Sequence, residues 1–315
     1  MTRTVFSVIL ETMNVKDSVY SESSWLAFLK SVFVPSLRKA FCKCVPSIFF
    51  NFFLRQYHAA FLPGRVPVSK VDHPLDEKIP FVPAWVTIYL DFVNFWIRML
   101  SFFLRRYGRR VYAQSGAFIQ SMGELYAFAS EVYRKNFSTT NRPFYIARPR
   151  FFLIHLLDPH LMCIPSLHVM VAIHAYTQFE AIAKSLGEEE RLKEQAFEMR
   201  QGALAISQAI LFVKQHSVNC IPAALYAMTC FSPELFPPEE AQAFTQRLFS
   251  PAPDKSSMPP GCRVHPAASP STKLTAADTA EIKGHIFTLY RRFLEEGKPC
   301  EFWGEPLVNF LRKLN

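Results

Sequence analysis

The sequence predicts an all-α fold, a polytopic membrane helix bundle of about five or six spans with a short soluble C-terminal tail. Half of the 315 residues are apolar, and 31 of them are Phe. Only 19% are charged, against about 25% in an ordinary soluble domain. Long uncharged segments recur along the chain, and helices of about 20 apolar residues are what a bilayer requires. These three observations favour a membrane protein over a soluble one.

The composition excludes several other classes of protein. Many aromatic residues and few charges exclude wholesale disorder. The seven Cys are unclustered and odd in number, which is not the pattern of a secreted disulfide framework. The net charge is +9, and we interpret it as several local basic sites. We therefore expect no nucleic-acid partner.

The chain divides into three predicted parts. Residues 1–45 mix short apolar runs with charges and are expected to form a cytoplasmic or interfacial segment. Their apolar run at residues 5–10 is too short for a signal peptide. Residues 46–235 form the predicted bundle. Residues 236–315 are expected to be a Pro-rich linker followed by a small helical tail.

The strongest candidate span is Ala84–Leu104, with only Asp91 and Arg98 charged. At 1.5 Å per residue, about 21 residues cross a hydrocarbon core of about 30 Å. The segment Arg105–Arg110 follows it and is typical of a cytoplasmic membrane boundary. The other candidate spans are Val45–Leu62, Val111–Val132, Pro159–Phe179, Gln201–Val213 and Gln215–Pro233. Buried helices of a soluble all-α protein are the alternative interpretation of these segments.

Two short helices are predicted in the tail. Asp278 can cap a helix that runs to about Glu296. Its apolar residues recur at intervals of three or four and define one face; they are Ile282, Ile286, Leu289 and Phe293. A second helix is expected within residues 301–314.

Three polar clusters interrupt this apolar background. The first runs from Lys135 to Arg142-Pro143 and places two cations around hydroxyl and amide side chains, a composition suited to phosphate. A basic loop at the membrane edge is the alternative interpretation of this first cluster.

The second cluster contains Pro165, Ser166 and His168 at the start of an uncharged run. A helix N-terminus there is a candidate anion site, and His168 could protonate a leaving oxygen. A capped helix with a core histidine is the alternative.

The third cluster contains Lys214, His216 and Asn219 between two apolar stretches. Lys and His at the depth of a membrane are costly and usually functional, although a simple helix–helix turn is the alternative. A metal site made from His155, His160, Cys163 and His168 lacks a recognised ligand spacing. We therefore expect no metal and no other cofactor.

The predicted topology places the three clusters on one side of the bilayer. If Arg105–Arg110 is cytoplasmic, the next span ends at Lys135 on the outer face. Ser166 and His168 then begin a span from that face, and the span before His216 returns to it. We expect an integral protein of the cell (inner) membrane, with the site on the non-cytoplasmic side.

The order Lys135-x6-Arg142-Pro143, then Pro165-Ser166-x-His168, then His216 resembles the signature of the type-2 phosphatidic acid phosphatase superfamily. The resemblance covers about residues 75–235. Leu167, where the phosphatases commonly have Gly, favours the sphingolipid head-group transferase branch that contains inositol-phosphoceramide-type synthases. The resemblance implies that the substrate is a membrane lipid with a phosphate head group and that the protein acts in phospholipid metabolism.

The resemblance also implies residue roles. His216 would attack phosphorus and form a phosphohistidine, while His168 would protonate the departing alcohol and later activate the acceptor. The phosphate oxygens would be held by Lys135, Arg142 and Ser166, with Lys214 substituting in part for a missing arginine. Water as acceptor gives a hydrolase, and a lipid hydroxyl gives a transferase. Electrostatic stabilisation of this kind is what phosphoryl transfer chiefly needs.

Departures from the family pattern keep other functions open. Cys220 stands where the family has the Asp that orients the nucleophilic His, and an unoriented imidazole is a poorer nucleophile. Asp158, Asp91 and Glu124 are candidate replacement carboxylates. A catalytically degenerate member that binds phospholipid or a partner, and a polytopic transporter or scaffold, are the alternative functions.

Overall fold

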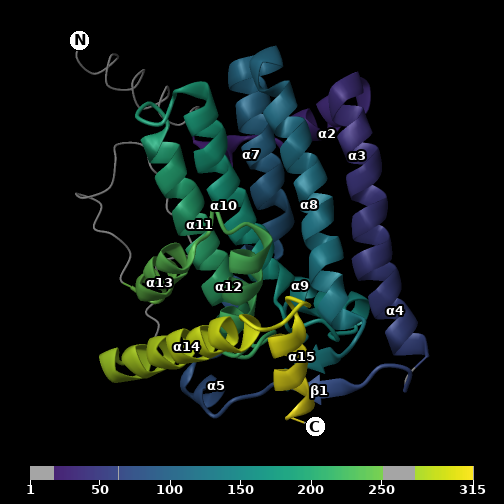
Figure 1. Cartoon of the computed structure of the whole chain (residues 1–315), viewed down its shortest axis with the longest axis vertical. Helices are drawn as coiled ribbons and strands as arrows, with labels where there is room; N and C mark the ends of the chain where they lie inside the picture. Colours follow the sequence, from purple (N-terminus) through teal and green to yellow (C-terminus); the bar gives the residue numbers. More distant parts are fainter. Residues whose placement is uncertain (1–17, 63, 251–273, 315) are drawn as a thin grey trace.

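The computed structural model describes residues 18–62, 64–250 and 274–314. The chain is mainly helical, which confirms the all-α prediction (Figure 1). The α-helices are α2 (Ser24–Phe33), α3 (Pro35–Ile48), α4 (Leu54–Phe61), α5 (Leu75–Lys78), α6 (Val86–Leu90), α7 (Phe92–Tyr107), α8 (Tyr112–Tyr133), α9 (Pro149–Leu157), α10 (Leu167–Leu186), α11 (Lys193–Phe212), α12 (Cys220–Phe231), α13 (Pro238–Arg247), α14 (Ala276–Gly297) and α15 (Glu305–Arg312).

Shorter turns of helix connect several of these elements. The 3-10 turns are η1 (Val19–Ser21), η3 (Pro83–Trp85) and η4 (Gly108–Val111). A π-helical stretch, η2 (Phe49–Phe53), joins α3 to α4, so residues 35–61 follow one helical path. The π-helical stretch thus interrupts a regular helix without ending it.

The centre of the molecule is a bundle in which α3, α8, α7, α10 and α11 stand side by side (Figure 1). Helix α3 packs closely on α8, and Gly123 makes that approach feasible. A Cβ atom at Gly123 would lie 2.8 Å from Cα of Cys44, closer than van der Waals contact allows. The hydroxyl of Ser47 donates to the Gly123 carbonyl over 2.7 Å at the same crossing.

The predicted spans correspond to helices with different limits. Val111–Val132 matches α8, whereas Ala84–Leu104 is divided at Asp91, which pairs with Arg98 over 2.8 Å. The segment Pro159–Phe179 becomes helical only at Leu167, and α10 ends at Gly187 in the left-handed conformation (φ 68°). No single described helix is long and apolar enough to cross a membrane. The segments Pro83–Leu90 and Phe92–Tyr133 together have the length and composition for it, with a bend of 42° between them.

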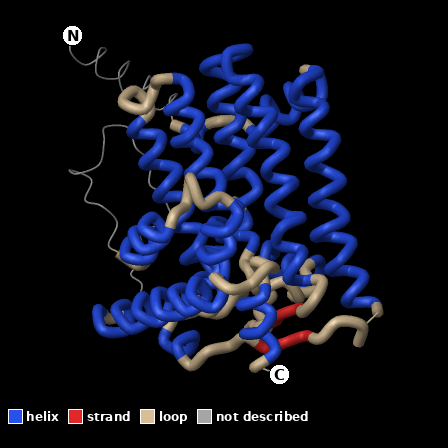
Figure 2. Tube along the Cα trace, viewed as in Figure 1, coloured by secondary structure: helices blue, strands red, loops and turns tan. Residues whose placement is uncertain are grey.

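Two strands lie where only loops were expected. β1 (Val68–Lys70) pairs in parallel with β2 (Phe137–Thr139), with Val68 opposite Phe137. The pair lies at one end of the bundle, beside α15 and α4 (Figures 1 and 2). Three-residue strands carry too few alternating positions to be predicted from hydrophobic periodicity.

The tail packs against the bundle through α14, which contacts α12. The predicted face of Ile282, Ile286, Leu289 and Phe293 is buried, as expected. The cap is Thr275 and not Asp278: the Thr275 hydroxyl accepts from the Asp278 N–H over 3.0 Å. Asp278 instead occupies the third helical position, as in a capping box. The predicted second helix is α15, and most of the predicted linker, like residues 1–17, lies outside the described residues.

Candidate active site

The two histidines of the predicted signature meet at one end of the bundle. His168 lies in the first turn of α10, and His216 lies in the loop of residues 213–219 between α11 and α12, here called the His216 loop. Their ring centroids are 5.4 Å apart, with an angle of 70° between the rings. The beginning of α10 and the ends of α8 and α11 are at this end, and η4 is at the other (Figure 1). The three clusters therefore share one end of the bundle, as the topology required.

His216 is nearly enclosed, with 7% of its surface exposed. Burial, reinforced by the neighbouring His168 and His160 rings, holds its pKa well below the ordinary value of histidine. Its Nδ1 atom is buried and has no hydrogen-bond partner. The ring is consequently neutral at pH 7 and keeps a nitrogen free for a ligand or a reacting atom.

His168 is held by an aromatic wall. Its ring stacks on Tyr89 of α6 with centroids 4.3 Å apart, and the ring of Phe92 from α7 lies 4.2 Å away. Both rings come from the segment that breaks at Asp91. The break thus places two aromatic side chains on one histidine, which fixes the imidazole and limits the access of water.

Ser166 is fully buried immediately before α10, and its hydroxyl has no hydrogen-bond partner. The first backbone N–H groups of a helix also lack partners within the helix. A buried hydroxyl without a hydrogen-bond partner is costly unless a ligand supplies that partner. An anion next to the start of α10 would satisfy both sets of donors.

Arg142 links the His216 loop to the segment before α10. One terminal nitrogen donates to Oε1 of Gln215 over 3.2 Å, and the other donates to the carbonyl oxygen of Asp158 over 3.0 Å. The Asp158 carboxylate lies 3.8 Å from the guanidinium. These contacts hold a permanent positive charge against Gln215, the residue before His216.

His160 completes a row of three imidazoles, with its ring centroid 6.2 Å from that of His216. The Asp158 carboxylate accepts from the His160 backbone N–H over 2.9 Å and lies 3.7 Å from Nδ1. Thr140 bonds to Nε2 of His160 over 2.8 Å. Burial alone would raise the pKa of Asp158, but His160 and Arg142 together lower it to about 2.

Neither predicted lysine joins this group. The ammonium of Lys135 lies 4.7 Å from the centroid of the Phe302 ring, because the connection between α14 and α15 covers the end of α8. The ammonium of Lys214 donates to the backbone carbonyl of Asp76. Within the described ranges, no hydrogen bond or ion pair joins either lysine to Arg142 or to the two catalytic candidates. Of the four predicted phosphate ligands, both lysines thus make their contacts elsewhere, whereas Arg142 bonds to the His216 loop and Ser166 lies just before His168.

Among the described residues, no hydrogen bond or ion pair joins a carboxylate to the His216 ring, where the family resemblance calls for an Asp. Cys220 is buried at the start of α12. Asp91 pairs with Arg98, and Glu124 accepts from Gln120 over 2.8 Å. Asp158 is the one candidate of the three whose charge acts on His216, but its carboxylate is paired with His160.

The sequence did not reveal Asp76 of α5, which anchors the His216 loop. Its carboxylate accepts from the backbone N–H of Val218 over 2.7 Å and from that of His73 over 2.8 Å. Tyr89 was missed as well. Both residues act across long stretches of sequence, and neither lies in a recognisable motif.

A strained backbone also marks the loops around the histidines. His160 and Lys214 adopt left-handed conformations, with φ of 59° and 53°. Residues other than Gly pay for that conformation, and such strain clusters at functional sites. Among residues 18–62, 64–250 and 274–314, no three His, Cys, Asp or Glu side chains are grouped to hold a metal ion.

Comparisons with protein-family models, with characterised proteins and with solved structures found no match to this chain.

Proposed function

We propose that the protein is an integral-membrane phosphatase or phosphotransferase that acts on a lipid phosphate through a phosphohistidine, in the manner of the type-2 phosphatidic acid phosphatases. One observation carries the proposal: His168 of α10 and His216 of the loop between α11 and α12 lie 5.4 Å apart between ring centroids. Arg142 bonds to Gln215, the residue before His216. Two neighbouring imidazoles, one of them in a loop that also holds a cation, suit a phosphate ester.

The proposed first step is attack by the neutral His216 ring on phosphorus. A P–N bond forms, the P–O bond to the lipid alcohol breaks, and His168, an imidazolium when the anionic phosphate is bound, gives its proton to the departing oxygen. Arg142 and the Ser166 hydroxyl hold the phosphoryl oxygens as charge moves onto the leaving group. In the second step His168 takes a proton from water or a lipid hydroxyl, whose oxygen displaces His216.

The distribution of exposed apolar side chains supports a membrane setting. Several large side chains lie exposed on the outer surface of helices α2, α3 to α4, and α9. They are Trp25, Phe28, Leu29, Phe33, Phe49, Phe50, Phe53, Leu54, Phe61, Phe152, Leu153 and Leu156. Soluble monomers rarely expose apolar surface on this scale. With Arg105–Arg110 at the opposite end of the bundle from His216, we place the site on the non-cytoplasmic face of the cell membrane.

A non-catalytic phospholipid-binding protein is the second candidate. It is favoured by the unpartnered Nδ1 of His216 and by Cys220 at the position of the family carboxylate. Such a protein would use Arg142 and Ser166 to hold a head group without transferring it.

Phosphate transfer from radiolabelled lipid distinguishes the two functions. The purified protein is mixed with a lipid phosphomonoester or phosphodiester, and phosphate release, head-group exchange and protein labelling are measured. We expect an acid-labile label on wild-type protein and on His155→Gln, and none on His216→Ala. Lipid binding of normal affinity without turnover or labelling in the wild type would establish the second candidate instead.

A further inference from the structure

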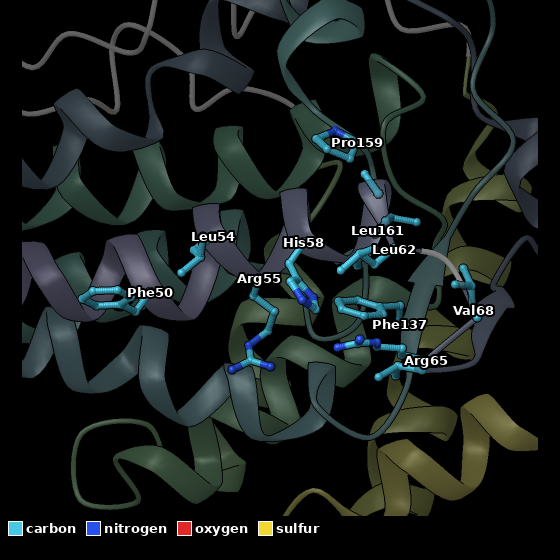
Figure 3. Close-up of a pocket in the computed structure, with 14 residues that line it drawn as sticks. Phe50, Leu54, Arg55, His58, Leu62, Arg65, Val68, Phe137, Pro159 and Leu161 are labelled. Atoms are coloured by element: carbon cyan, nitrogen blue, oxygen red, sulfur yellow. The ribbon is translucent and has the colours of Figure 1, made fainter.

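A cavity of about 650 Å³ lies beside α4, and neither of the two catalytic candidates lines it. Its walls come from the π-helical stretch and α4, from residues 64–68, and from Phe137 of β2 with Pro159 and Leu161 (Figure 3). Nothing in the proposed reaction uses this space. Its volume is far larger than a phosphate ion needs and is typical of small-molecule sites.

The lining carries positive charge without a counterion. Arg55, His58 and Arg65 are among the lining residues, and no described Asp or Glu is. Nε of Arg55 is buried and has no hydrogen-bond partner. The guanidinium of Arg134 is near enough for its charge to act unfavourably on Arg55. A buried donor nitrogen without an acceptor is costly, so an anionic ligand that accepts from Nε would relieve the site.

The rest of the lining is apolar. Phe50 and Leu54 extend the cavity along the helical path, and Phe137 and Leu161 close its inner side. Figure 3 shows Arg55 and His58 on the side of α4 that faces Phe137 and Arg65, with Phe50 and Leu54 farther along the same path. Phe50 and Leu54 are 57% and 47% exposed. The cavity therefore continues into the exposed apolar surface of the same helical path.

We propose that this cavity is a second lipid site, which binds a phospholipid through an anionic phosphate head group. The phosphate lies between Arg55 and Arg65, with His58 as a further donor, and an acyl chain lies along Phe50 and Leu54. Arg suits this role because its planar donors match phosphate oxygens. An apolar chain accounts for the volume that a free phosphate would leave empty.

The site is adjacent to the histidine pair but separate from it. Pro159 and Leu161 line the cavity, whereas His160 between them packs toward His216. Successive side chains of one short segment thus contact the two sites from opposite sides. Lipid binding here does not require that His216 be catalytic.

Photocrosslinking tests the proposal in a His216→Ala background, where the probe cannot be consumed. Protein in phosphatidylcholine vesicles is labelled with photoactivatable phosphatidic acid, and labelled peptides are mapped by mass spectrometry. We expect labels in residues 49–66, outcompeted by phosphatidic acid but not by phosphatidylcholine or inorganic phosphate. Competition by inorganic phosphate as effective as that by phosphatidic acid would overturn the lipid assignment.

Matched substitutions locate the head group. Arg55→Gln with Arg65→Gln should weaken phosphatidic acid binding about tenfold or more, since charge-assisted hydrogen bonds are lost. Arg109→Gln, at the opposite end of the bundle, should leave it unchanged, and Arg142→Gln should leave the label in residues 49–66. Arg65→Gln alone is measured as well, because it retains the buried Arg55. Unchanged affinity in folded Arg65→Gln and in the double variant would overturn the proposal, as would labelling confined to peptides that contain His168 or His216.

Discussion

The carboxylate of Asp76 accepts a hydrogen bond from the backbone N–H of Val218, two residues after His216, over 2.7 Å. The same carboxylate accepts from His73, and the Asp76 backbone carbonyl accepts from Lys214. One residue of a four-residue helix thus holds both sides of the His216 loop. The position of the proposed nucleophile depends on a residue that takes no part in the chemistry.

Asp76→Asn tests this positioning role. The amide replaces one acceptor oxygen with a donor, so one of the two backbone N–H groups loses its partner. We expect the free energy of unfolding to fall by about 1–2 kcal/mol and kcat to fall by about tenfold with little change in KM. Glu77→Gln, on the exposed neighbouring carboxylate, should change neither. A variant that lowers stability but leaves kcat intact would show that Asp76 only supports the fold.

Substrates with different leaving groups distinguish the roles of the two histidines. His216→Ala should remove phosphoryl transfer for every substrate, because no P–N bond can form. His168→Ala should slow release of an alkyl alcohol by about 10²–10⁴-fold, the usual contribution of general acid catalysis. It should slow release of a nitrophenol far less, since that oxygen leaves without a proton. Equal losses for both leaving groups in His168→Ala would contradict the proton-donor role.

Asp158→Asn tests the group formed by Asp158, His160 and Arg142. The pKa of Asp158 is lowered to about 2 from 3.8, so its charge stabilises the fold above pH 3.8 and this contribution is lost as the pH falls toward 2. We expect the substitution to reduce the free energy of unfolding by about 2 kcal/mol at pH 7. Denaturant titrations at pH 7 and at pH 3 should show the difference from wild type shrinking at the lower pH. Glu124→Gln is the exposed control, and a pH-independent difference would contradict the ion-pair explanation.

The sequence predicted the parts of the site that follow from helix boundaries. Ser166 and His168 begin an uncharged helix, and His216 lies between two apolar ones, so their meeting at one end of the bundle follows from the alternation of helices. Lys135 was expected at the phosphate, and nothing near it in sequence indicates that its ammonium lies over the Phe302 ring instead. The roles of Asp76 and Tyr89 were unpredictable for the same reason. Their contacts join distant segments, which local periodicity does not record.

The break at Asp91 shows a similar limit. Hydropathy favours a continuous segment from Ala84 to Leu104, and the charges of Asp91 and Arg98 look like interruptions of it. In the structure they pair with each other, and α6 and α7 meet at Asp91. The bend is what sets Tyr89 and Phe92 against His168. A sequence pattern gives the apolar content of such a segment but not its bend.

Acid should loosen the contact between the tail and the His216 loop through His285. Nε2 of His285 bonds to Oδ1 of Asn219 over 2.8 Å, and its ring centroid lies 4.1 Å from that of His73. Burial, with smaller effects of His73 and Arg292, lowers the pKa of His285 to about 4. Because the folded state prefers the neutral ring, its contribution is complete above about pH 6.5 and is lost as the pH falls toward 4. We expect a loss of about 2 kcal/mol across that window, reduced from the full shift because the ring is partly exposed.

Amide hydrogen exchange in α14 between pH 7 and pH 4.5, corrected for the intrinsic rate, measures this effect. Protection of Ile282 and Ile286 should decrease as the solution is acidified. His285→Gln keeps a donor for Asn219 but cannot gain a proton, so its protection should depend less on pH. His58→Gln, on α4, should behave as the wild type does. If His285→Gln retains the full pH dependence, another group controls the docking of α14, and His73 across the ring contact would be the first to test.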